Sequence, residues 1–202
     1  YACHPSLVRE NAVSPDFPGR VSKYLEDMYG DSHISCFLQG FSGDVKANLL
    51  QVNNNISVGI LRWFYNLLFD RVLFKKRLSV EELDSFSLRL IGFIDPSRAS
   101  TLNTSLFSCG VEVSVPLDCS TLKESGDNCN ELYDPVTIKI QRISIGNNLD
   151  IVAINGEVFS HYSTWLRNKL LKYGRKVIPV GCANGMIGYI PDGKAVIEGG
   201  YE

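Results

Sequence analysis

Two tyrosines stand twelve residues apart in the glycine-rich closing segment, Gly181 to Glu202, which reads GCANGMIGYIPDGKAVIEGGYE. The hydroxyls of Tyr189 and Tyr201 can donate or accept a hydrogen bond, and both tyrosines look placed for chemistry. Glycine-rich turns with aromatic residues are common, however, and a buried tyrosine usually does no more than hydrogen-bond through its hydroxyl. The segment alone is therefore open to a structural interpretation, and the rest of the chain must decide.

Further sequence blocks along the chain favour a chemical role for the two tyrosines over a structural one. The sequence opens with YACHP around His4, continues with SPDFPG at 14–19 and FLQGFSGDVKAN at 37–48, and carries INGEVFSHYSTWLR at 154–167. Together with the closing GYIP and EGGYE, this ordered set resembles the neutral/alkaline non-lysosomal ceramidase family. No single block is long, but the likeness is spread over most of the chain. The resemblance implies a zinc-dependent amidase domain that cleaves the amide of ceramide.

The resemblance also implies a metal site. Matched to the family's motifs, His4, Glu157 and Tyr189 become zinc ligands, which suits a metal that binds imidazole nitrogen and carboxylate oxygen, although such ligands fit other divalent ions too. A second histidine of the family lies upstream of the HP block and has no counterpart here. We therefore expect residues 1–202 to be the C-terminal portion of one ceramidase-like catalytic domain, with an upstream segment of the same protein supplying that ligand.

Two catalytic candidates follow from the same resemblance. Tyr201 matches the tyrosine that faces the tetrahedral oxyanion, where a preorganised hydroxyl donor would stabilise developing charge. Lys46 stands where the family's ceramide-cleaving members carry a serine, and its ammonium group would stabilise an anion or bind an acidic substrate group. Water activated by zinc needs no side-chain nucleophile, so hydrolysis stays expected while ceramide as the substrate is in doubt. Ser42, four residues earlier, is not expected to replace that serine.

Other roles stay open for several of these residues. A lone histidine before proline, as at His4, is more often structural than a ligand, and Lys46 by itself is most often a solvated side chain. Glu157 could cap the following helix, where the dipole favours a carboxylate. His161 follows Glu157 by four residues, and the two would share one face if both were helical. His161 is therefore an alternative ligand.

Composition excludes some classes of protein. The chain has 202 residues, 45% of them hydrophobic, with 20 basic and 22 acidic residues and a formal net charge of −2. That length suits one globular domain or most of one. Without a clustered basic surface, nucleic acid is not expected as a partner. The expected partner is a small-molecule or lipid-like N-acyl substrate.

The sequence also gives expectations for membrane contact and for the compartment in which the protein works. No run of about 20 apolar residues exists to span a membrane. The apolar stretch 58–74 has a helical pattern that favours core packing, or else peripheral membrane contact near the mouth of a site. The six cysteines include no C-x-x-C pair, and a disulfide between Cys119 and Cys129 would close a polar loop in an oxidising compartment. The expected location is secreted, periplasmic or cell-surface.

The elements that would position these residues form a mixed α/β pattern. We expect an α/β fold, a mixed β-sheet with flanking helices, and no internal domain boundary. Ser79 and Glu82 form a predicted capping box, and the alternating IKIQRISI at 138–145 predicts a strand with one side toward a core. The predicted helices are 20–29, 57–74, 79–91 and 159–173, and the predicted strands are 35–38, 111–115, 138–145, 149–154 and 176–180.

Three functions are compatible with these residues. The leading hypothesis is a ceramidase-like, zinc-dependent hydrolase of an N-acyl amide bond, with His4, Glu157 and Tyr189 on the metal and Tyr201 at the oxyanion. The second is a noncatalytic module that keeps the fold and binds a metal or ligand. The third, weaker hypothesis is a metal-dependent hydrolase of esters or sugars.

Overall fold

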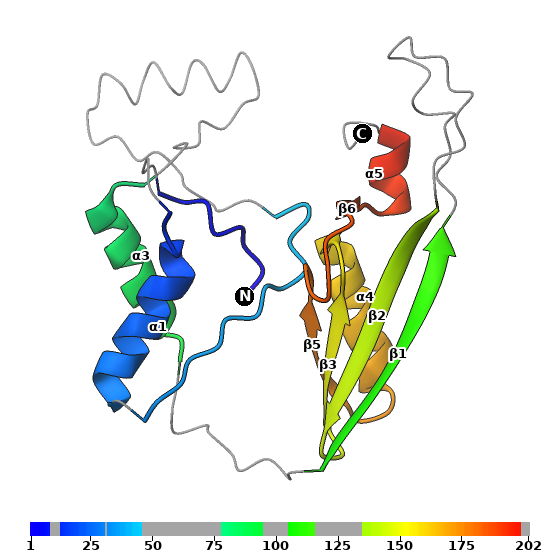
Figure 1. The fold of residues 1–202 in the computed structure, drawn as a ribbon, viewed down its shortest axis with the longest axis horizontal. Helices are drawn as coiled ribbons and strands as arrows, with labels where there is room; N and C mark the ends of the chain where they lie inside the picture. Colours follow the sequence, from blue (N-terminus) through cyan, green and yellow to red (C-terminus); the bar gives the residue numbers. More distant parts are fainter. Residues whose placement is uncertain (9–12, 31, 46–77, 95–104, 116–134, 199–202) are drawn as a thin grey trace. The chain divides into compact units, whose positions relative to one another are not determined.

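The protein is described by a computed structural model that covers residues 1–8, 13–30, 32–45, 78–94, 105–115 and 135–198 (Figure 1). The chain divides into two units, each assembled from separate stretches of sequence. Unit 1 comprises Tyr1–Cys3, Leu38–Val45 and Arg98–Glu202, and unit 2 comprises His4–Phe37 and Lys46–Ser97. The expectation that all 202 residues form part of one catalytic domain stays a prediction.

Unit 1 contains a four-stranded sheet in the order β1-β2-β3-β5. Three strands are antiparallel neighbours, and β5 joins β3 in parallel, so the sheet is mixed. The helix α4 lies in the crossover between β3 and β5 and packs against β5 (Figure 1). The bounds are β1 Leu106–Val115, β2 Val136–Ile145, β3 Leu149–Ile154, α4 Ser160–Leu171 and β5 Lys176–Val180. The predicted mixed sheet with flanking helices is thus confirmed.

Two short parallel strands form a separate, two-stranded sheet. β4 is Glu157–Val158 and β6 is Tyr189–Ile190, and they pair with each other. A short helix, α5 (Gly193–Glu198), follows β6. The sequence predicted neither short strand, because two residues carry no readable periodicity.

A buried ion cluster fixes one end of the larger sheet. Asp150 is fully buried (0% exposed), and its carboxylate accepts hydrogen bonds from Arg175 Nε and Nη2, both at 2.6 Å, and from the Ser144 hydroxyl at 2.7 Å. Arg142 adds an ion pair at 3.1 Å. Burial raises the pKa of Asp150, but the hydrogen bonds from Arg175, Ser144 and Arg142 outweigh it and hold the pKa well below its ordinary value.

This cluster corrects the prediction for 138–145. The sequence predicted a strand with a single apolar face. Alternate residues of a strand point to opposite faces, however. Ile138 and Ile140 therefore share a face with Ser144, whereas Ile143 and Ile145 lie on the other face. The apolar residues change face across Gln141 and Arg142. The buried residue of β2 is Ser144, because it pairs with Asp150. The buried residue of this strand therefore makes a polar contact.

Unit 2 packs two helices against each other, α1 (Asp16–Tyr29) and α3 (Val80–Ile91). Phe17 is buried and makes an edge-to-face contact with Phe86 at a ring separation of 5.7 Å. Arg20 and Asp84 form an ion pair across the two helices at 2.8 Å. The predicted capping box of Ser79 and Glu82 is confirmed at the start of α3. The predicted strand at 35–38 is wrong, since this stretch runs without strand pairing.

The SPDFPG block has a structural role at the start of α1. The carboxylate of buried Asp16 accepts hydrogen bonds from the backbone N–H groups of Leu7 (2.8 Å), Val8 (3.0 Å) and Phe17 (2.7 Å). These bonds attach the segment after His4 to the helix. The helix consequently begins at Asp16, four residues before the predicted start.

Candidate functional site

The pairing of β4 with β6 places Glu157 beside Tyr189. The two residues are register partners, and the Glu157 N–H donates to the Gly188 carbonyl at 2.8 Å. Register partners in a sheet project to the same face, so a carboxylate and a phenol stand next to each other. The Glu157 Oε2 atom is buried, whereas Tyr189 is half exposed. Gly188 has φ +97°, a left-handed conformation that glycine adopts without cost and that turns the chain into β6.

The glycine loop of 40–44 packs on the backbone of this site. The Gly43 N–H donates to the Val158 carbonyl at 2.9 Å. A Cβ atom at Gly43 would lie 2.5 Å from the Glu157 carbonyl oxygen and 2.8 Å from Phe159 Cδ1. Real Cβ atoms do not approach backbone so closely, so the loop reaches β4 only because residue 43 is glycine.

Asp44 completes the first turn of α4. Its carboxylate accepts from the Ser160 N–H at 2.6 Å and from the Ser160 hydroxyl at 2.8 Å. An acceptor at this position satisfies an N–H group that has no partner inside the helix. The helix-capping role considered for Glu157 therefore belongs to Asp44. The sequence showed Asp44 within the GDV block but gave no sign of its partner, which lies 116 residues away.

Ser42 lies inside the same loop. It is buried, and its hydroxyl accepts a hydrogen bond from the Gln39 side-chain amide at 2.6 Å. Gln39 also donates to the Cys3 carbonyl at 3.1 Å and thus ties the loop to the first residues of the chain. These contacts give Ser42 a structural role in holding the loop.

Cys182 is a neighbour of Glu157 that the sequence reasoning missed as a site residue. Its N–H donates to the Gly156 carbonyl at 3.0 Å, and its backbone is left-handed at φ 54°. The residue is exposed, yet partial burial of the thiol, together with the Glu157 carboxylate, raises the pKa of Cys182. The backbone contact with Gly156 thus places Cys182 next to the strand that carries Glu157.

The remaining predicted residues are distributed as follows. His4 belongs to unit 2, whereas Glu157 and Tyr189 belong to unit 1. Lys46 and Tyr201 lie outside the described residues, as do Cys119, Cys129 and the stretch 58–74. The structure thus places two of the five predicted site residues side by side.

His161 does not share a helix face with Glu157, contrary to the sequence interpretation. Glu157 lies in β4, and α4 begins only at Ser160, so the spacing of four residues is not a helical one. His161 is exposed on α4, where its ring contacts Tyr162 at 6.0 Å. Helical spacing therefore gives no support for His161 as a metal ligand.

The residues present suit one part of a zinc site. Within the described ranges, no group of three or more His, Cys, Asp or Glu side chains is gathered to hold a metal ion. Glu157 and Tyr189 do present two oxygen donors from neighbouring strands, and carboxylate oxygen is a normal zinc ligand. These donors fit a site that draws its nitrogen ligands from elsewhere.

Comparison with known proteins identifies the fold. The sequence matches no known protein-family model and no curated protein. A solved structure described as "Ceramidase complexed with C2" superposes with a TM-score of 0.58 at 14% sequence identity, over 90% of this chain. The chain has a ceramidase-like fold. It spans 37% of the length of that ceramidase.

Proposed function

We propose that this ceramidase-like chain belongs to a zinc-dependent hydrolase of N-acyl amide bonds. The observation that carries the proposal is the pairing of Glu157 with Tyr189 on adjacent strands of a ceramidase-like fold. These are two of the residues that the family resemblance designates as ligands, and they are 32 positions apart in sequence (189 − 157). A likeness of fold alone would not require them to be neighbours.

In this proposal the ligands are His4, Glu157 and Tyr189, with a further histidine from an upstream segment of the same protein. Bound zinc supplies a polarising charge that lowers the pKa of water to about 7 and activates a carbonyl. Tyr201 donates its hydroxyl hydrogen to the oxyanion that develops on the amide carbonyl. Lys46 contributes a positive charge toward an anionic intermediate or an acidic group of the substrate.

The described contacts explain how the protein would keep Glu157 in place. The Glu157 N–H donates to the Gly188 carbonyl, and the Gly43 N–H donates to the carbonyl of the next residue, Val158. A ligand held by rigid backbone loses little freedom when the metal binds, which favours affinity. The loop of residues 40–44 is accordingly a support for the carboxylate.

The substrate class follows from the fold and from Lys46. The neighbour is titled a ceramidase, so an N-acyl lipid amide is the first class to test. Because lysine replaces the serine of ceramide-cleaving members, we propose a substrate other than ceramide, and an acidic group near the amide would complement the ammonium group.

The alternative is a noncatalytic module that retains the fold and binds a metal or ligand. The lysine at position 46 favours it, since the family's serine hydroxyl is absent. This alternative predicts metal binding without turnover, which separates it from the hydrolase.

The test combines metal content with activity on the longest natural form of the protein. Elemental analysis of the wild type should find one zinc per chain, and His4→Ala, Glu157→Ala and Tyr189→Phe should each lower the zinc content and abolish release of fatty acid from N-acyl substrates. The matched controls His33→Ala and Glu198→Ala change a histidine bonded to Ser35 and an exposed glutamate near Lys194, and both should keep the metal.

The outcomes discriminate among the hypotheses. Zinc bound without turnover on any N-acyl, ester or glycoside substrate would favour the noncatalytic module. A wild type that binds no zinc would overturn the metal mechanism.

A further inference from the structure

The helix α4 and the residues after it carry an unusual charge for this chain. From Ser160 to Lys176 the sequence contains five basic residues and no aspartate or glutamate, although the whole chain has 20 basic and 22 acidic residues. The five are Arg167, Lys169, Lys172, Arg175 and Lys176. Arg175 neutralises buried Asp150, so four cations stay available at the surface. A local excess of positive charge attracts anionic partners.

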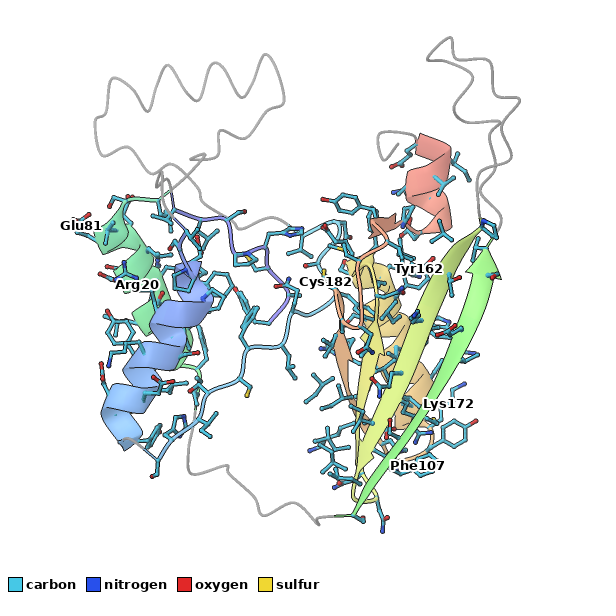
Figure 2. The ribbon with its side chains drawn as sticks, viewed as in Figure 1. Arg20, Glu81, Phe107, Tyr162, Lys172 and Cys182 are labelled. Carbon is cyan, nitrogen blue, oxygen red and sulfur yellow. The ribbon has the colours of Figure 1, made fainter. Side chains whose placement is uncertain are left out.

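Two exposed residues of α4 and its C-cap residue form a stripe along one side of the helix. Trp165, Lys169 and Lys172 recur at positions i, i+4 and i+7, the spacing of one helix face. All three are exposed, whereas Leu166 and Leu170, on the side that packs toward the sheet, are partly covered. Figure 2 marks Lys172 near the C-terminal end of α4 and Tyr162 near its beginning.

Large apolar groups accompany these charges. The exposed fractions are 52% for Trp165, 68% for Leu171 and 78% for Tyr173. The Lys169 Nζ atom lies 5.5 Å from the centre of the Trp165 ring, a cation–π distance. We call Trp165, Lys169, Lys172 and Tyr173 the outer face of α4; Leu171, six positions after Trp165, lies on another side of the helix.

We propose that the outer face of α4 docks on a membrane surface that contains anionic lipids. Tryptophan and tyrosine rings prefer the headgroup level of a bilayer, and lysines bind the negative surface through long flexible side chains. The exposed rings of Trp165 and Tyr173 add apolar area that a purely polar polyanion would leave in water. Charge complementarity and the exposed aromatic rings therefore both favour a lipid surface.

Another surface had been considered for such a contact from sequence alone, the stretch 58–74, which lies outside the described residues. The outer face of α4 is a different surface, and the argument for it uses only described side chains. Within the described part of the chain, no helix is long and apolar enough to cross a bilayer. The proposal is independent of the hydrolase activity, because it requires neither zinc nor Tyr201.

The test is flotation of the full chain with vesicles. Vesicles of phosphatidylcholine with about one-third phosphatidylserine should bind the protein at low salt, and vesicles of phosphatidylcholine alone should bind it weakly. Each basic residue near such a surface contributes enough that its loss should weaken binding about fivefold. We therefore expect Lys169→Gln and Lys172→Gln each to reduce vesicle affinity about fivefold, and their combination about 25-fold. Raising the salt concentration should also weaken binding of the wild type to these vesicles, because salt screens the charges.

Matched controls are lysines of the same exposure elsewhere. Lys23→Gln in α1 and Lys194→Gln in α5 remove one exposed lysine each from i,i+4 pairs and should leave vesicle affinity unchanged. Circular dichroism and thermal melting of every variant would show that the fold is kept. Trp165→Phe gives a second readout, since the blue shift of tryptophan fluorescence on vesicle addition should be lost in this variant.

The following results would overturn the proposal. Equal losses in the Lys23 and Lys194 controls would mean that net charge alone governs binding. Absence of binding to anionic vesicles would exclude the lipid surface, and binding to heparin or RNA without vesicle binding would assign the face to another polyanion. A fluorescence shift that persists in Trp165→Phe would place the contact elsewhere on the chain.

Discussion

Asp150 is the residue whose charge the fold depends on most directly. Its carboxylate is fully buried and receives hydrogen bonds from Arg175 and Ser144 as well as an ion pair from Arg142. Removing the anion would leave the guanidinium groups of Arg142 and Arg175 without their shared carboxylate partner. A buried charge that loses its partner costs far more than an exposed one.

Asp150→Asn should lower the free energy of unfolding by about 3 kcal/mol, measured by urea denaturation at pH 7. Because the pKa of Asp150 is depressed in the folded state, its ionised form stabilises the fold above the ordinary value of about 4. That contribution is lost as pH falls through this value toward the folded pKa. The wild type should therefore lose stability more steeply than Asp150→Asn below about pH 4.

Asp27→Asn is the matched control, since Asp27 is exposed and pairs only with Lys23 along α1. This change should have a far smaller effect at either pH. Equal losses in the two variants would show that the Asp150 cluster has no special role.

Gly43 is the second residue whose substitution has a specific expected effect. Gly43→Ala introduces a Cβ atom at 2.5 Å from the Glu157 carbonyl oxygen, so the loop or β4 must shift. We expect a loss of about 1–3 kcal/mol, the usual cost of overpacking, together with reduced zinc content. Thermal melting and elemental analysis would measure the two effects.

Gly193→Ala serves as the control for this substitution, because a Cβ atom there meets nothing within 4 Å. Alanine at this position in α5 should be neutral or slightly stabilising. If Gly43→Ala were as harmless as Gly193→Ala, the close approach of the loop to β4 would be wrong.

At the scale of elements, α4 depends on a residue from outside its own sequence. Phe159 precedes the helix and provides no side-chain cap, while Asp44 binds both the N–H and the hydroxyl of Ser160. By contrast, α3 is capped locally by Ser79 and Glu82. The two helices thus differ in whether their beginnings are set by neighbours in sequence or by tertiary contact.

Asp44→Ala should destabilise unit 1 by about 1 kcal/mol, the typical contribution of a cap, and should increase hydrogen exchange in the first turn of α4. Asp44→Asn should lose less, since its amide oxygen still accepts a hydrogen bond. Exchange in α3 should stay unchanged and provides the internal control. Unaltered exchange at Ser160 and its neighbours would contradict the capping role.

At the scale of the whole molecule, the two units are interleaved in sequence. The chain passes from unit 1 to unit 2 at residue 4, returns at 38, leaves again at 46 and returns at 98. No change in composition marks these points, which is why no boundary was visible in the sequence. The proposed ligands are likewise divided, with His4 in unit 2 and Glu157 and Tyr189 in unit 1.

Zinc bound by the proposed ligands should raise the melting temperature of the protein. At a hundredfold excess over Kd the expected stabilisation is about 3 kcal/mol, because a ligand that binds only the folded state shifts the equilibrium toward it. His4→Ala and Glu157→Ala should each remove this shift, measured by calorimetry with and without zinc, whereas His33→Ala should retain it. Stabilisation that persists in both ligand variants would mean that zinc binds elsewhere.

The sequence by itself determined the elements whose cause is local. The capping box of α3 and the strands β2 and β3 arise from patterns among residues close in sequence, and those patterns predicted them. The sequence did not predict where α1 begins, because its start is set by the contact of Asp16 with Leu7 and Val8. Identification of Glu157 and Tyr189 as candidates came from motif resemblance.

Only the tertiary structure decided which of these residues are neighbours. The pairing of Glu157 with Tyr189 joins two strands of two residues each, too short to show any period in the sequence. The cap from Asp44 crosses 116 residues, and the close approach of Gly43 to Glu157 depends on backbone atoms. Such contacts form when the chain folds back on itself, since hydrogen bonding and steric fit act through space and not along the sequence.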